Sequence, residues 1–109
     1  MVEYIIVLST VPDESRGHEI ARALVEARLA ACVTVSPPSR STYRWEQKIV
    51  EEREHVLLIK TKAALYEDLE IKLKELHPYR VPEIIALPVS RGSEKYLEWL
   101  DAEILKPTR

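Results

Sequence analysis

The sequence predicts an α+β domain with the ferredoxin-like order β-α-β-β-α-β, extended by one more helix toward the C-terminus. Short apolar segments typical of strands are separated by two stretches whose apolar residues recur every three or four positions. Prolines and capping residues mark the ends of these stretches. A chain of 109 residues is expected to form a single domain, residues 1–109, with a sizeable core.

The first strand is predicted over residues 2–10, and the first helix follows it directly. Both faces of this strand are apolar, so we expect it to be central in the sheet. Pro12-Asp13-Glu14 predicts the helix start, because carboxylates are favourable near the positive end of a helix dipole. The apolar stripe of the helix consists of Ile20, Leu24, Ala27 and Ala31.

The second strand is predicted over residues 32–35, followed by a break at Pro37-Pro38. Neither proline can donate a hydrogen bond to a neighbouring strand, so a bulge or an edge is expected there. Extended sequence resumes over residues 41–45. Glu46-Gln47 is the predicted hairpin tip, although it lacks the Gly or Asn that tight turns favour.

The strand predicted over residues 48–62 is too long for a domain of this size. It would measure roughly 50 Å at about 3.3 Å per residue, whereas a compact domain of this length is roughly 30–35 Å across. Part of the hairpin should therefore overhang the monomer, with Tyr43 and Trp45 near its tip. We expect this tip to dock on another copy of the chain, because exposed aromatic ribbons are marginal alone. The alternative is a bent or shorter strand, with Trp45 folded back into its own core.

The second helix is predicted over residues 63–76, with Leu65, Leu69, Leu73 and Leu76 on its buried face. It should end before His77-Pro78, because the residue preceding a proline is disfavoured in the helical region. A short apolar strand is predicted over residues 83–89. Ser93 then caps the final helix.

The composition excludes several classes of protein. The formal charge is −2 with both signs interspersed, so neither a nucleic-acid partner nor a membrane surface is expected. The longest apolar runs have five residues, against the roughly 20 that span a bilayer. Few amides, two glycines and many charged residues are typical of heat-adapted, thermostable proteins.

The cellular compartment is expected to be the cytoplasm. The N-terminal residues are strand-like and lack the basic region of a signal peptide. Cys32 is the only cysteine, which excludes an internal disulfide and is typical of a reducing compartment.

The sequence contains no catalytic motif that we recognise, so we expect no enzyme activity. Glycine-rich phosphate loops, GxSxG, HExxH and CxxC are all absent. The only soft metal donor is Cys32, which is either a small buried core residue or a thiolate ligand for a metal such as copper. A single thiol makes a poor site, so three copies, or Cys32 with His77 of a neighbour, would make a better one. No cofactor is expected to be obligatory.

Lys60 and Glu83 are charged residues at the ends of apolar strands. Each is either a strand terminus that reaches solvent or a member of a partly desolvated pair that lines a pocket. The sequence leaves these two interpretations open.

The chain resembles the CutA divalent-cation tolerance family along nearly its whole length. The matching stretches are ARALVE (21–26), RLAACV (28–33), YRWE (43–46), LIKT (58–61), HPY (77–79), VPEIIALP (81–88) and YLEWL (96–100). The resemblance implies a ferredoxin-like fold, a homotrimer with interlocked hairpins, and tolerance of copper and other divalent metals. Thr34, Pro38, Gln47 and Arg80 depart from the family pattern, and Arg80 places a cation near His77.

The resemblance also implies the site residues. The family's cysteine corresponds to Cys32, and its recurrent polar positions correspond to Lys60, His77 and Glu83, near clefts between subunits. We therefore expect Cys32, His77 and Glu83 to bind metal, and Lys60, Tyr43 and Trp45 to lie at the intersubunit cleft. The family is also similar in architecture to PII signalling trimers. A regulatory trimer that binds a small metabolite or a partner protein is thus the alternative function.

Overall fold

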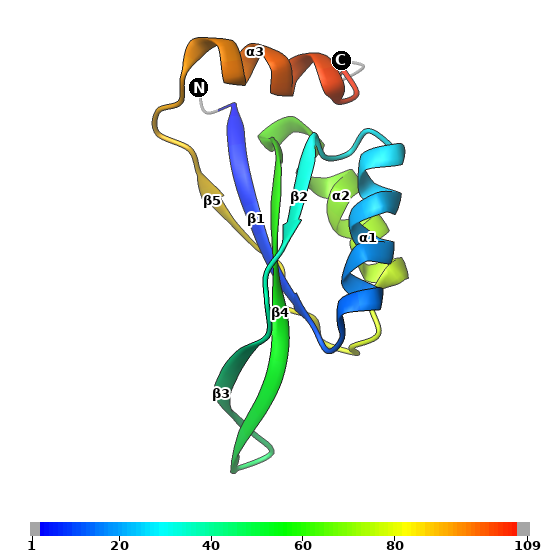
Figure 1. Cartoon of the computed structure of the whole chain (residues 1–109), viewed down its shortest axis with the longest axis vertical. Coiled ribbons are helices and arrows are strands. Elements are labelled where there is room, and N and C mark those ends of the chain that lie inside the picture. The colour runs from blue at the N-terminus through cyan, green and yellow to red at the C-terminus, as the bar shows by residue number, and fades with distance from the viewer. Residues whose placement is uncertain (1–2, 107–109) are drawn as a thin grey trace.

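The computed structural model describes residues 3–106 and has the predicted α+β architecture (Figure 1). The elements are β1 (Tyr4–Val11), α1 (Glu14–Glu26), β2 (Cys32–Val35), β3 (Ser39–Trp45), β4 (Lys48–Lys62), a 3₁₀ turn η1 (Ala63–Leu65), α2 (Tyr66–Leu76), β5 (Ile85–Pro88) and α3 (Glu94–Glu103). Their order is the predicted one. The start of the first predicted strand, at Val2, lies outside the described residues.

The strands form an antiparallel sheet in the order β2-β4-β1-β5, and β3 pairs with the first half of β4. β4 lies between β1 and β2, so α1 connects two strands that are not neighbours, which is a split β-α-β arrangement. The predicted central position of β1 is confirmed, since β4 and β5 flank it.

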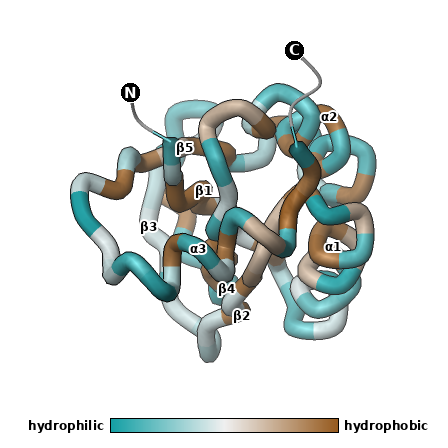
Figure 2. Tube along the Cα trace, turned by 90° about the horizontal axis from the view of Figure 1, so that it is seen from above, coloured by the Kyte–Doolittle hydropathy of each residue, from teal (hydrophilic) through white to brown (hydrophobic). Residues whose placement is uncertain are grey.

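Helices α1 and α2 cover one face of the sheet, where they lie side by side (Figures 1 and 2). Because side chains alternate along a strand, every second residue of β1 and β4 points toward these helices. Full burial of each such aliphatic side chain stabilises the fold by about 1.5–3 kcal/mol. This helix-covered core contains Ile5, Val7, Val11, Ile20, Leu24, Leu57, Ile59, Leu69 and Leu73.

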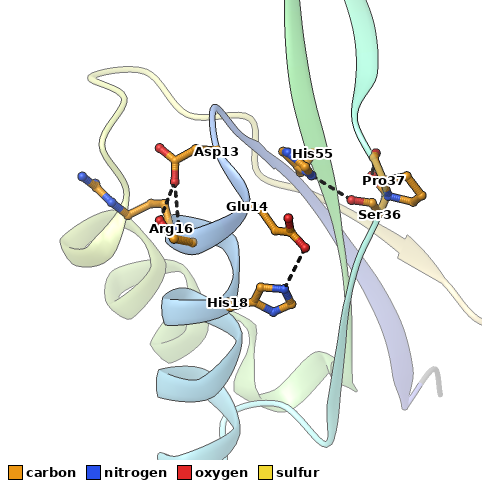
Figure 3. A network of polar contacts seen from close by, with 8 residues as sticks. Asp13, Glu14, Arg16, His18, Ser36, Pro37 and His55 are labelled. Carbon is orange, nitrogen blue, oxygen red and sulfur yellow. Dashed lines mark hydrogen bonds and ion pairs between the residues drawn. The ribbon is translucent and has the colours of Figure 1, made fainter.

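Helix α1 starts as its sequence predicts and approaches the sheet closely. The Asp13 carboxylate caps the helix by accepting the backbone N–H of Arg16 at 2.7 Å (Figure 3). Four residues later Gly17 faces β2, where an added Cβ would lie 3.1 Å from Cγ1 of Val35. The helix can therefore pack this tightly because position 17 has no side chain.

The predicted break between the second strand and its continuation is confirmed, with β2 ending at Val35 and β3 beginning at Ser39. Ser36 anchors the break to β4 through both its backbone and its side chain. The Nδ1–H of His55 donates to the Ser36 carbonyl at 2.9 Å (Figure 3), and Ser36 Oγ accepts the Val56 N–H at 2.8 Å. These bonds replace the pairing that Pro37 and Pro38 cannot make.

The β3–β4 ribbon projects away from both helices, as the length of the strand predicts (Figure 1). The molecule measures 43 × 25 × 25 Å. Glu46 and Gln47 form the tip with φ values of 49° and 68°, the positive pair of a type I′ turn. Trp45 is 52% exposed. The alternative prediction, in which Trp45 folds back into the core of its own chain, is therefore wrong.

The last strand is shorter than predicted, because β5 covers residues 85–88 and not 83–89. Its register with β1 would place Glu83 opposite Thr10. The Thr10 carbonyl at that level instead accepts a hydrogen bond from His77 Nε2 at 2.8 Å. The strand therefore starts two residues later, and Glu83 belongs to the preceding loop.

Helix α3 packs across the end of the sheet that carries the N-terminus (Figure 1). Lys62 of β4 donates to Asp101 of α3 at 2.6 Å, and both side chains are partly shielded. The hydrogen bond from Lys62 holds the pKa of Asp101 below its ordinary value of 3.8, and the same bond raises the pKa of Lys62.

We expect Asp101→Asn to lower the melting temperature at pH 7, because the neutral amide loses the charge interaction with Lys62. A carboxylate whose pKa is depressed by folding stabilises the fold above its unfolded pKa, and this stabilisation is lost as pH falls. The difference between variant and wild type should therefore shrink as the pH falls below about 3.8, the ordinary value for Asp101, toward the lower pKa of the folded state. Thermal melts at pH 7 and pH 3 check this. A difference in melting temperature between variant and wild type that is equal at pH 7 and pH 3 would contradict a stabilising ion pair.

Candidate functional site

The face of the sheet opposite α1 and α2, here called the outer face, is apolar and carries no helix over its centre (Figure 1). Its side chains alternate with those of the core, so their orientation follows from the register. Ile85 and Leu87 on the edge strand are 50% and 48% exposed. The apolar residues of the outer face are Ile6, Leu8, Val56, Leu58, Ile85 and Leu87.

Further apolar side chains are exposed at the tip of the ribbon and on α3. Trp45 at the tip is accompanied by Ile49, which is 60% exposed. On α3 the rings of Tyr96 and Trp99 are tilted against each other, with centroids 5.5 Å apart, and both are exposed. An apolar surface of this extent marks an interaction site in proteins generally.

Cys32 lies on the outer face and outside the helix-covered core. It is opposite Lys60 in the β2–β4 register, and Lys60 alternates with the core residues Ile59 and Thr61. The thiol residue is half-buried. The Lys60 ammonium lies over the ring of Tyr96, 5.7 Å from its centroid. Cys32 is therefore available from the outer side of the sheet, next to a cation.

His77 occupies a different place and has both ring nitrogens engaged. Its Nε2–H donates to the Thr10 carbonyl, while Nδ1 accepts the N–H of Tyr79 at 3.0 Å. Burial lowers the pKa of His77, so the neutral imidazole that these two bonds require is favoured. The ring thus fixes the loop after α2 to the end of β1.

The structure does not bring Cys32 and His77 together within one chain. Cys32 is level with Ile6 of β1, and the partner of His77 is Thr10. Four residues along a strand correspond to about 13 Å. Within residues 3–106 no group of three His, Cys, Asp or Glu side chains is arranged to hold a metal ion.

Three of the predicted site residues, Tyr43, Trp45 and Glu83, do lie together. They line a groove of about 690 Å³ between the β3–β4 ribbon and the loop 78–83, here called the ribbon groove. Lys60 does not line it. No ion pair joins Lys60 to Glu83 within residues 3–106, so the two residues are not paired inside one chain.

Glu54 and Tyr79 are central to the groove and were not predicted. Glu54 is only 5% exposed, and its Oε2 accepts the Tyr79 hydroxyl at 2.7 Å. Burial, and then this hydrogen bond, raise the pKa of Tyr79, so its phenol stays a donor. Nearby, the Tyr43 hydroxyl donates to Glu52 at 2.8 Å, and that bond raises the pKa of Tyr43.

No helix within residues 3–106 has the length and apolar content needed to cross a membrane. The polar network shown in Figure 3 lies at the start of α1 and beside the β2–β3 break, and none of its labelled residues lines the ribbon groove. It contains the exposed pair His18–Glu14 at 3.5 Å, which we assign to helix stability alone.

Comparison with known proteins connects these features to one family. The family profile described as CutA1 divalent ion tolerance protein matches residues 5–103. The divalent-cation tolerance protein CutA of Thermus thermophilus is 50% identical over 95 residues, covering 87% of this chain and 92% of that protein. The crystal structure of CutA1 from Oryza sativa superposes with a TM-score of 0.93 at 41% identity, covering 96% of each chain.

A third relative is the Archaeoglobus fulgidus CutA, described as a periplasmic divalent cation tolerance protein. It is 32% identical with a TM-score of 0.89, and the match covers 92% of this chain and 97% of that one. The identities, the coverage and the shared α+β fold agree with the resemblance in the sequence. This chain belongs to the CutA1 divalent ion tolerance protein family.

Proposed function

We propose that this protein is a homotrimeric divalent-cation tolerance protein that binds copper through Cys32 without catalysing a reaction. The observation that carries this proposal is the position of Cys32. It is the only thiol of the chain, and it lies half-buried on the apolar outer face beside Lys60. Thiolate ligands favour Cu(I) over harder metals.

The apolar outer face supports the trimer. The outer face and the ribbon tip both expose large apolar side chains, and apolar surface that gathers in this way marks interaction sites in proteins generally. A ribbon that projects beyond its own domain can reach the outer face of a neighbour, and a closed ring would let every subunit give and receive one ribbon.

The trimer would also supply further metal donors to Cys32. Glu83 is exposed and has no ion-pair partner among residues 3–106, so it could approach a neighbouring thiol without loss of a bond. His77 would first have to release either Thr10 or Tyr79. Of the two predicted assisting ligands, Glu83 is therefore the more readily recruited.

We expect Cys32→Ser to weaken Cu(I) binding at least tenfold while the trimer persists, because a hard oxygen replaces the soft sulfur at nearly equal size. Binding by wild type should also weaken as the pH falls, since the proton competes with the metal for the thiolate. The measurement is competition against a chromophoric copper chelator, with mass determined on the same samples. A trimeric variant that binds copper as tightly as wild type would contradict the role of Cys32.

We also propose a cytoplasmic location and high heat resistance. Burial of the outer face by association would add stability that increases with the logarithm of protein concentration. We expect a melting temperature above roughly 90 °C, the usual mark of a hyperstable domain. A melting transition near 55 °C would contradict the heat resistance. Recovery of the native protein from the periplasm of its own cells would contradict the cytoplasmic location.

The second candidate function is a PII-like regulatory trimer that binds a small metabolite. The ribbon groove favours it, because its volume of about 690 Å³ is that of a small-molecule site. Copper binding that depends on Cys32 supports the first function, and saturable binding of an organic ligand in the groove supports the second.

A further inference from the structure

The ribbon groove contains a buried carboxylate that lacks a cation. Glu54 is more than nine-tenths buried, and no lysine or arginine of residues 3–106 lies within 4.0 Å of it. One of its oxygens accepts the Tyr79 hydroxyl, and the other has no protein partner but is not sealed from solvent. Because little of this carboxylate meets water, an interaction with a cation is screened less there than at an exposed residue. Its open oxygen is therefore a place where a positively charged group would be held.

The rest of the groove continues this chemistry along its length. Glu52 and Glu83 add two carboxylates, and Arg80 is the single basic residue of the lining. The rings of Tyr43 and Tyr79 also line the groove. Aromatic faces attract alkylammonium groups, and they pack against the methylene segments that join such groups.

A metal ion does not satisfy this arrangement. Metal ions require several donors converging on one point, and no three His, Cys, Asp or Glu side chains of the described residues converge in this way. Carboxylates spread along an aromatic groove instead match a cation whose charges are themselves spread along a chain. The volume of about 690 Å³ accommodates such a molecule.

We propose that the ribbon groove binds a flexible organic polycation of the polyamine class, with one ammonium group on Glu54 and others near Glu52 and Glu83. This inference deepens the second candidate function and rests on it. The Tyr79 hydroxyl is the positioning group, since its hydrogen bond fixes one oxygen of Glu54 and leaves the other directed to the ligand.

The test is calorimetric titration of the metal-free, full-length protein with spermidine at low ionic strength. We expect saturable binding, weakened about tenfold or more by Glu54→Gln, because hydrogen bonds to charged groups contribute about 1.5–3 kcal/mol. The glutamine can still accept the Tyr79 hydroxyl, so the fold should persist. Glu83→Gln changes an exposed residue and should weaken binding several-fold.

The matched control is Glu51→Gln, which removes the same charge from the same strand. Glu51 lies outside the groove and pairs with Arg40 at 3.7 Å, so this variant should bind spermidine within twofold of wild type.

Equal weakening by all three substitutions, or equal heats of binding when Mg²⁺ replaces spermidine, would overturn the site in favour of charge screening. Absence of saturable binding would also overturn it. If Glu54→Gln does not fold, the test depends on Glu83→Gln. Spermidine binding by that variant as tight as by wild type would then overturn the site. Copper competition on the same preparations reports the first function separately.

Discussion

Replacing Trp45 by alanine should weaken the trimer by about 2–4 kcal/mol per contact, the usual effect of truncating a central interface aromatic. Trp45 lies at the tip of a ribbon that projects beyond its own domain, and it is half exposed in the single chain. Its indole therefore contributes little to the monomer core and should contribute mainly to a contact with a neighbour. The measurement is the dissociation midpoint on dilution, followed by light scattering.

The control for this substitution is Ile71→Ala on α2. Ile71 is 60% exposed, but it belongs to a helix that covers the opposite face of the sheet. Ile71→Ala should leave the assembly unchanged. Comparison of the two variants therefore separates the loss of the Trp45 contact from a general loss of exposed apolar surface. An unaltered dissociation midpoint for Trp45→Ala would show that the ribbon tip does not make the contact.

Leu58→Glu should abolish the trimer at micromolar concentration and leave a folded monomer. Leu58 is on the outer face opposite Leu8 of β1, and its side chain points away from the core. In the single chain the new carboxylate would face water, whereas in the trimer it would be buried without a partner. An uncompensated buried charge commonly costs about 3–5 kcal/mol, and a symmetric trimer would contain three of them.

Circular dichroism and mass together check this prediction. The expected result is a spectrum like that of wild type at the mass of one chain. Ile71→Glu places the same charge on the helical side and should stay trimeric. A Leu58→Glu protein that is trimeric would show that the outer face is open to solvent in the assembly. A Leu58→Glu protein that is unfolded would show that Leu58 belongs to the monomer core.

Local patterns were enough to predict most of the fold. Asp13 before a helix, Pro37-Pro38 after a strand and His77-Pro78 after a helix each act through the backbone of their immediate neighbours, so the corresponding boundaries are confirmed. The hairpin tip at Glu46-Gln47 was also predicted. The prediction came from the extended sequence on both sides, although neither residue is the Gly or Asn that tight turns favour. Pairing along the ribbon holds both residues at positive φ although neither is glycine.

The parts that sequence reasoning missed depend on contacts between distant segments. His77 is 67 positions from Thr10, whose carbonyl it holds, and nothing near His77 in the sequence indicates this partner. The same contact shortens β5, so the predicted start of that strand at Glu83 was wrong. Side chains that bind a remote backbone carbonyl carry no local signature.

The ribbon groove was only partly foreseeable. The sequence singles out Tyr43, Trp45 and Glu83, whereas Glu54 stands in a run of four charged residues, 51–54, and nothing local distinguishes it from its neighbours. Its burial results from the loop 78–83 closing over it and from the hydroxyl of Tyr79, 25 positions away. The available signal was position: Glu54 is the last carboxylate before the apolar run that begins at Val56, where the strand enters the domain.

The mass of the wild-type protein in solution tests the central claim most directly, because the proposed metal site and the covered outer face both depend on assembly. Sedimentation equilibrium over a hundredfold range of concentration gives this mass without a standard. We predict three times the chain mass of 12.6 kDa throughout the micromolar range. A single species at one chain mass would contradict the account, since the ribbon tip and the outer face would then remain exposed to water.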